Sequence, residues 1–166
     1  LPVSFVTEAQ CDEIASLYES YKNNVKKLKF PIMRFNRCML RDEVDDMTTD
    51  ACIGLESLLA GSTHTEITNA IASRIPLVFS KVGDPKYLAT NGRGYMKKIY
   101  NLRSRIVHGD ELKDKDIYIG NGENRIYIPK MAVDFLRLTL LFMIKNPTYL
   151  KVEEIDAYID SLVLNS

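Results

Sequence analysis

The chain has 166 residues, of which 46% are hydrophobic, and its 22 Lys plus Arg residues balance 22 Asp plus Glu residues. This length fits one domain whose core can fold without metals or disulfides, and the composition excludes disordered and collagen-like proteins. A net charge of zero argues against a histone-like protein that binds nucleic acid over its whole surface, although a local basic site is compatible with it.

Cysteine and histidine are few and widely spaced in this sequence. The cysteines Cys11, Cys38 and Cys52 form no Cys-x-x-Cys pair, and the histidines are His64 and His108. We therefore expect no metal, no cofactor and no disulfide framework, and we expect reduced thiols in the cytoplasm.

Neither the apolar segments nor the start of the sequence indicates a membrane protein. The most apolar stretch, residues 131–144, contains Asp134 and Arg137, so we expect no membrane span there. The first residues lack the layout of a signal peptide. Because the chain begins with Leu1 rather than Met, we expect it to be processed, trimmed or excised from a longer protein.

Apolar residues recur at helical spacing through the first part of the chain. Thr7 with Gln10 three residues later is a capping-box pattern, which predicts a long first helix that ends just before Pro31. Pro31 is then expected to begin a second helix. After the acidic segment at 41–46, a third amphipathic helix is predicted to stop at Gly61.

The next segments predict a fourth helix followed by loops. Thr63 with Glu66 repeats the capping-box pattern ahead of this helix, which we expect Pro76 to kink. The segments GDPKY (83–87) and TNGRG (90–94) are typical of loops.

The pattern changes once in the last part of the chain. Residues 95–106 have helical spacing, and Gly109 is expected to end that fifth helix. Two β-branched and aromatic runs around a Gly/Asn turn predict a β-hairpin at about 117–128. An apolar helix from Pro129 to Lys145 and a last helix after Pro147 complete the chain. The sequence therefore predicts an all-α bundle with one small inserted hairpin.

The fifth helix carries the strongest chemical signal, since phosphate-loop, dinucleotide-binding, zinc-protease and serine-hydrolase motifs are absent from the sequence. Between residues 93 and 108 it has no acidic residue and five basic ones, which are Arg93, Lys97, Lys98, Arg103 and Arg105. Such a stripe suits phosphate binding. A solvated helix face, with several lysines merely exposed, is the alternative.

His108 and Arg103 are the candidate catalytic pair on this helix. An imidazole can act as a general acid or base near neutral pH, and a guanidinium can hold a phosphate oxygen. Arg103 lies five residues before His108, about 140° around an ideal helix, so the two share no face. They could converge if the helix end unwinds, if Arg103 reaches round, or if a second copy supplies half of the site.

The stretch IYNLRSRIVHG, residues 99–109, closely resembles the signature helix of the Apea-like branch of HEPN domains. The upstream stretch DACIGLESLL, residues 50–59, resembles the second signature of that branch. Residues 34–46 and 69–79 also lie where related segments would fall, so the resemblance spans roughly Met33 to Gly109. It implies a single HEPN-like domain over 1–166.

The resemblance also assigns residues. Arg103 and His108 match the family's Arg-x4–6-His pair, Ser104 matches the polar residue after the arginine, and Glu56 matches the acidic position of the upstream helix. Glu56 would orient Arg103 or the histidine, or hold a structural salt bridge. Ser104 replaces the commoner Asn, Asp or His, and Asp110 stands where the nucleotidyltransferase-paired branch has Tyr, so that branch is not matched.

The family implies a function at the interface of two protomers. Many members are metal-independent endoribonucleases of toxin–antitoxin, CRISPR-linked and other antiviral systems, with both motifs facing one cleft. We therefore expect a homodimer that cleaves RNA to a 2′,3′-cyclic phosphate and a 5′-hydroxyl. The remaining basic residues of the helix would bind RNA phosphates, and these are Arg93, Lys97, Lys98 and Arg105.

Two other interpretations stay open. One is a non-catalytic HEPN module that binds RNA or nucleotide, or assembles with other domains or chains of a defence complex, for example as the C-terminal part of a longer protein. The other is a structural helical bundle in which Arg103 and His108 only cap and bridge helices.

Overall fold

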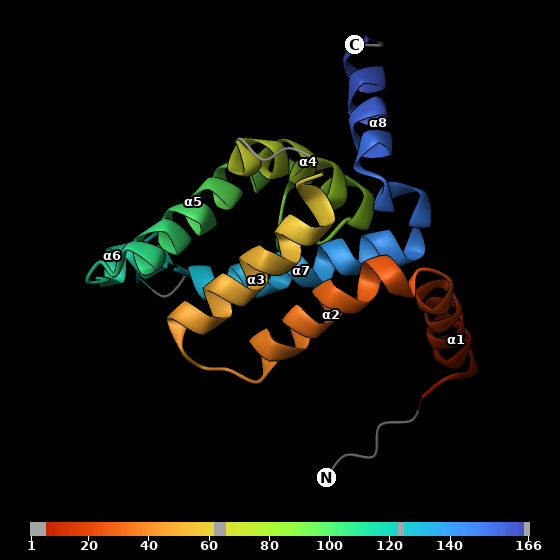
Figure 1. The fold of residues 1–166 in the computed structure, drawn as a ribbon, viewed down its shortest axis with the longest axis horizontal. Helices are drawn as coiled ribbons and strands as arrows, with labels where there is room; N and C mark the ends of the chain where they lie inside the picture. Colours follow the sequence, from red (N-terminus) through yellow and green to blue (C-terminus); the bar gives the residue numbers. More distant parts are fainter. Residues whose placement is uncertain (1–5, 62–65, 123–124, 165–166) are drawn as a thin grey trace.

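Helices account for most of the structure, a computed structural model that describes residues 6–61, 66–122 and 125–164 (Figure 1). The helices are α1 (Glu8–Asn23), α2 (Val25–Met39), α3 (Val44–Leu59), α4 (Ile67–Val82), α5 (Ala89–His108), α6 (Asp114–Ile117), α7 (Ile128–Lys145), the 3-10 helix η2 (Pro147–Leu150) and α8 (Val152–Leu164). The strands are β1 (Tyr118–Ile119) and β2 (Ile126–Tyr127). The predicted all-α bundle with one inserted hairpin is confirmed.

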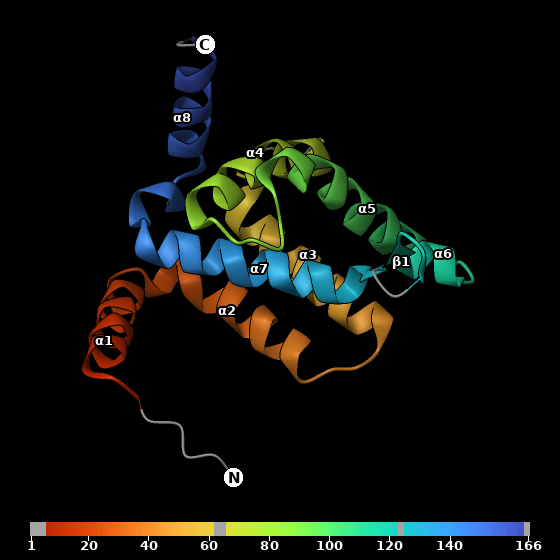
Figure 2. The same ribbon diagram turned by 180° about the vertical axis from the view of Figure 1, so that it is seen from behind.

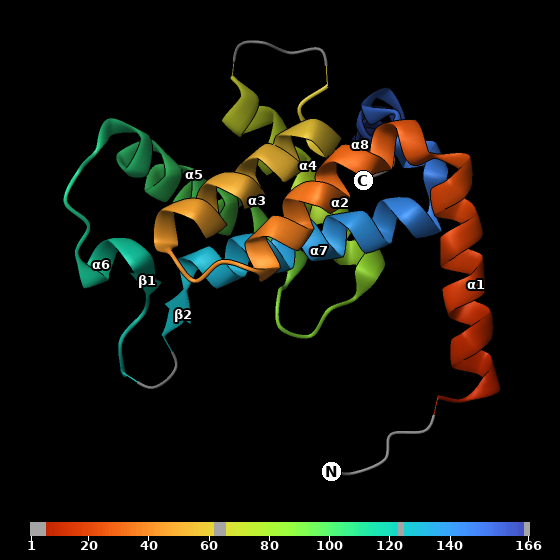
Figure 3. The ribbon, with the colours of Figure 1, turned by 60° about the horizontal axis from the view of Figure 1, so that its bottom comes forward.

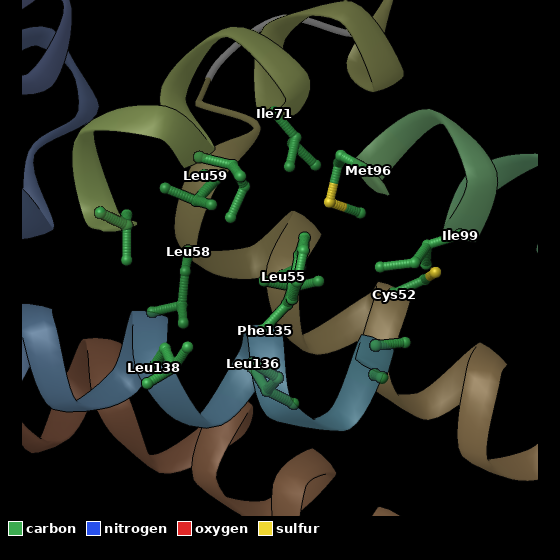
Figure 4. Close-up of a cluster of buried hydrophobic side chains, with 14 of the residues drawn as sticks. Cys52, Leu55, Leu58, Leu59, Ile71, Met96, Ile99, Phe135, Leu136 and Leu138 are labelled. Carbon is green, nitrogen blue, oxygen red and sulfur yellow. The ribbon is translucent and has the colours of Figure 1, made fainter. Parts of the chain in front are cut away.

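Helices α3 and α7 form the centre of the bundle, with α2 on one side and α4 and α5 on the other (Figures 1 and 2). The apolar side chains of α3, α5 and α7 meet between these helices, as Leu55, Met96 and Phe135 do in Figure 4. Gly54 brings α3 close to α7, because a Cβ there would lie 2.6 Å from Leu136 Cδ2. This core fixes the side of α5 that faces inward.

The boundary between the first two helices differs from the prediction. The capping box of Thr7 is present, but α1 ends at Asn23 and α2 runs through Pro31. Asn24 has a non-helical backbone, and its side-chain amide donates to Ser20 O at 2.9 Å, which ends α1. Pro31 is buried inside α2, where packing against the bundle offsets the backbone hydrogen bond that proline cannot donate.

The predicted loop at 90–94 is wrong, whereas the loop at 83–87 is confirmed. Helix α5 begins at Ala89 and includes both Gly92 and Gly94. The glycine at 92 lets α5 lie against α4, since a Cβ there would be 2.9 Å from Ile75 Cγ2. Tertiary packing thus overrides the local preference of glycine for loops.

Helix α4 runs from Ile67 to Val82 and continues across Pro76. It follows Gly61, which has a left-handed backbone just after the end of α3, as the sequence predicts. The capping residue expected at Thr63 lies outside the described residues.

The hairpin is shorter than predicted and follows a one-turn helix, α6, that the sequence pattern did not reveal. Its strands are antiparallel and pair Tyr118 with Tyr127 and Ile119 with Ile126. The insertion lies beside the C-terminal half of α5 and before α7 (Figure 3). It therefore borders the helix that carries the candidate site.

Helices α1 and α8 extend away from the bundle at the end opposite to this insertion (Figures 1 and 3). The buried Arg74 of α4 attaches α8, because its Nε and Nη2 donate to the two carboxylate oxygens of Asp156 at 2.7 and 2.6 Å.

None of the helices in the described part of the chain is long and apolar enough to cross a membrane.

Candidate functional site on helix α5

The end of helix α5 is fixed by glycine, as the sequence predicts. Gly109 adopts a left-handed backbone with a φ of 71°, and its N–H donates to Ile106 O at 3.0 Å. The N–H of Asp110 donates to Arg105 O at 3.0 Å, which completes a Schellman-type cap. His108 is therefore the last residue of a regular helix rather than part of an unwound end.

The outer face of α5 carries four of the predicted site residues. Arg93, Lys97, Ser104 and His108 are all exposed, and their spacing puts them on one stripe of an ideal helix. Among the residues that the structure describes, His108 makes no hydrogen bond or ion pair. The imidazole is thus free to meet a ligand or another protein chain.

Arg103 lies on a different side of α5, where it faces α3. Its Nη2 is 3.6 Å from Glu56 Oε1, and the two side chains are 32% and 23% exposed. Its Nε is buried with no hydrogen-bond partner in the described part of the chain. The guanidinium is therefore held at the α3–α5 contact, with one donor group unused.

Tyr100, which was not among the predicted site residues, completes this contact. Its hydroxyl donates to Glu56 Oε1 at 3.1 Å, and Arg103 Cζ is 6.0 Å from the centre of its ring. Burial raises the pKa of Tyr100 far above its usual value, so the hydroxyl stays protonated and remains a donor. A tyrosine three residues before Arg103, a spacing that makes the two side chains neighbours on a helix, was the available signal.

The structure of one chain does not bring Arg103 and His108 together. The helix stays regular as far as His108, and Arg103 points toward Glu56 instead of reaching round α5. Two of the three routes by which the pair could converge are therefore absent from the single chain. Glu56 pairs with Arg103, whereas it forms no hydrogen bond or ion pair with His108 in the described part of the chain.

Arg105 is occupied by acidic residues that follow the helix. Its Nε is 3.2 Å from Asp110 Oδ2, its Nη2 donates to Glu111 O at 3.0 Å, and it also pairs with Asp116. The backbone N–H of Lys113 and the Arg105 guanidinium together lower the pKa of Asp116. Arg105 thus holds the insertion against α5, and a phosphate would have to compete with these contacts.

Lys98 faces the flank of α5 that borders the insertion. It lines a hollow of about 530 Å³ together with Asn101, Ser104, Arg105 and residues of the hairpin.

Within the described residues, no group of three His, Cys, Asp or Glu side chains is placed to hold a metal ion.

Comparison with known proteins adds no assignment. No family model matches the chain, and no curated protein or solved structure is significantly similar to it.

Proposed function

We propose that the protein is a metal-independent endoribonuclease that acts as a homodimer, with a composite site built from the α5 helices of two copies. The observation that carries the proposal is the separation of two groups on α5. His108 is exposed and has no partner among the described residues, while Arg103 is held by Glu56 on another side of the same helix end. A two-fold axis beside this end would place Arg103 of one copy near His108 of the other.

The proposed chemistry uses these groups for an in-line displacement at phosphorus. One His108 removes the proton of the 2′-hydroxyl, and the O2′–P bond forms while the P–O5′ bond breaks. The His108 of the second copy donates a proton to the leaving 5′-oxygen. Arg103 stabilises the extra negative charge on the phosphorane, for which its planar fork is suited.

A single apolar residue supports association at this end of the helix. Val107 is 64% exposed and lies between the sides of α5 that carry Arg103 and His108. In a dimer with facing α5 ends, this side chain would leave water, which is favourable. The family resemblance suggests antiviral defence or toxin-type RNA degradation as the setting, and the three free cysteines fit a cytoplasmic location.

The test is cleavage of a mixed RNA pool in the presence of EDTA. We expect the wild-type chain to produce 2′,3′-cyclic phosphates, and we expect His108→Ala and Arg103→Ala to lower the rate by about 100-fold or more. Both variants should keep the wild-type circular dichroism and sedimentation behaviour. His64→Ala removes the other histidine and serves as the matched control. A requirement for Mg²⁺, or full activity of His108→Ala, would contradict the proposal.

A second candidate function is supported by the ion pairs that Arg103 and Arg105 already form within the chain. Arg103 pairs with Glu56, and Arg105 is surrounded by acidic partners, so neither is free in the isolated chain. This state suits a non-catalytic module that binds RNA or nucleotide through the remaining cations, or that assembles with other parts of a defence complex. RNA binding without cleavage in the same assay would select this function.

A further inference from the structure

Three adjoining hollows lie between α5 and the insertion that contains α6 and the hairpin. The largest, about 530 Å³, shares Lys98 and Ile119 with a second of about 370 Å³ toward the start of α5. It shares Lys115 and Tyr118 with a third of about 480 Å³ toward the hairpin turn. We call these three hollows the α5–hairpin groove. A groove of this extent can take a chain of several units rather than one small molecule.

Positive charge predominates along the groove. Four cations line it, which are Lys98, Arg105, Lys115 and Arg125. The lining carboxylates are Asp114 and Asp116, and they pair with Arg125 and Arg105 respectively. Lys98 and Lys115 are exposed and form no ion pair with the described residues. Two lysines are therefore available for an anionic ligand.

The hairpin adds flat surfaces to these charges. Arg125 Cζ lies 3.9 Å from the centre of the Tyr118 ring, and the rings of Tyr118 and Tyr127 are 5.2 Å apart. The two tyrosine rings are tilted by 38°, so the flat surface at the end of the groove is the Arg125 guanidinium over the Tyr118 ring, on which a nucleobase can stack. The amides of Asn91 and Asn101, which line the other hollows, can donate to and accept from base edges.

We propose that the α5–hairpin groove binds single-stranded RNA, with phosphates on Lys98 and Lys115 and a base on the Arg125–Tyr118 stack. This combination of cations, stacking surfaces and amides is the chemistry by which proteins hold single strands. A duplex keeps its bases stacked inside the helix and cannot use the guanidinium plane.

The inference rests on the proposed function, and it adds the path of the substrate. Ser104 lines the groove and lies one helical turn, about 6 Å along the axis, before His108. A strand in the groove would therefore pass close to the imidazole at the end of α5. The insertion of α6 and the hairpin has no role in the proposed catalytic step. In the groove it would hold the RNA strand against α5.

The experiment measures fluorescence anisotropy of a labelled single strand of about 12 nucleotides, in the His108→Ala background so that the strand stays intact. Removing both lysines (Lys98→Ala with Lys115→Ala) is expected to weaken binding at least fivefold and to reduce the slope of log affinity against log salt by about 1.4. Lys22→Ala is a control for the loss of one lysine away from the groove, because it removes an exposed lysine, paired with Glu19, from α1 at the opposite end of the molecule (Figure 1).

The stacking surface is tested separately from its charge. Arg125→Ala is expected to weaken binding of the single strand at least about fivefold. Arg125→Lys keeps the charge but loses the plane, so it should weaken binding nearly as much, whereas Tyr118→Phe keeps the ring and should bind like the parent chain. None of these changes should alter binding of a duplex of the same length.

The outcomes separate the groove from the nuclease. If the wild-type chain cleaves RNA but the groove variants bind like the parent, or if duplex and single strand bind equally, the groove proposal is overturned. If RNA binds with the predicted dependence but is never cleaved, the groove stands and the catalytic proposal fails. If no RNA binds, the groove proposal is also overturned.

Discussion

Glu56 connects α3 to α5 through one hydrogen bond, from Tyr100, and one ion pair, with Arg103. Its Oε1 accepts the hydroxyl proton of Tyr100 and lies 3.6 Å from Arg103 Nη2. Both members of the ion pair are partly exposed, so solvent screens their attraction. The contact is better suited to orient Arg103 than to stabilise the fold, and in the proposed enzyme Glu56 is therefore a positioning residue.

A double-mutant cycle at the residue scale tests this assignment. For Glu56→Gln and Arg103→Met, we expect a coupling in the free energy of unfolding below about 1 kcal/mol, as for other partly exposed pairs. Urea unfolding of the wild type, the single variants and the double variant gives this value. In the RNA assay, Glu56→Gln should lower kcat more than it changes KM.

The pair of Arg34 and Asp50 on the other side of α3 provides the matched control. Its atoms Nη1 and Oδ1 are 2.6 Å apart, and Asp50 is only 6% exposed. Asp50 Oδ2 also lies 3.9 Å from Arg41 Nε, so Arg34→Met leaves the buried carboxylate with this one distant cation. We expect the free energy of unfolding to fall by up to about 3–5 kcal/mol. A similar loss for Arg103→Met would favour the structural bundle in which Arg103 only bridges helices.

At the scale of a single element, the two glycines of α5 lie in different surroundings and have different effects on the helix. Gly92 faces α4, where a Cβ would lie 2.9 Å from Ile75 Cγ2 and 3.1 Å from Phe79 Cδ2. Gly94 has no atom within 4 Å of the corresponding position. The first glycine permits a close approach of two helices, and the second only lowers the intrinsic stability of the helix.

Alanine at these two positions is expected to have opposite effects. Gly92→Ala should lower the free energy of unfolding by about 1–3 kcal/mol, because the methyl group overpacks the α4–α5 contact. Gly94→Ala should raise it by about 0.5–1 kcal/mol through helix propensity alone. The midpoints of urea unfolding measure both changes, and a stabilising Gly92→Ala would show that α5 does not pack on α4 as described.

At the scale of the whole molecule, the core divides the cysteines into two kinds. Cys38 and Cys52 are buried and Cys11 is exposed, and all three are free thiols. Burial raises the pKa of Cys38 to about 12 and raises that of Cys52 well above its usual value. Since the thiolate is the reactive form, both buried thiols are protected by their low thiolate fraction and by the lack of access.

Thiol labelling of the native chain tests this packing. At pH 8 we expect a maleimide to modify Cys11 rapidly, whereas Cys38 and Cys52 should react only after unfolding in denaturant. Mass spectrometry of the labelled peptides gives the site and the rate. Rapid labelling of Cys52 under native conditions would mean that the contact of α3 with α5 and α7 is not closed.

The sequence by itself determined the features that depend on neighbouring residues. The capping box of Thr7, the stop at Gly109 and the hairpin around 118–127 are all present. Each is set by hydrogen bonds or backbone angles within a few residues, so local patterns report them directly. The apolar periodicity also predicted the bundle, because an amphipathic helix must cover its apolar face.

Only the tertiary structure decided which residues meet across elements. The segment with Gly92 and Gly94 is predicted as a loop, yet the packing of Gly92 against α4 keeps this segment helical. The basic residues of α5 looked equivalent in the sequence. In the structure Glu56 pairs with Arg103, acidic residues after the helix pair with Arg105, and Lys98 lines the groove beside the hairpin without an ion pair to any described residue. These differences arise from side chains distant in the chain, and a pattern of local spacing contains no information about such contacts.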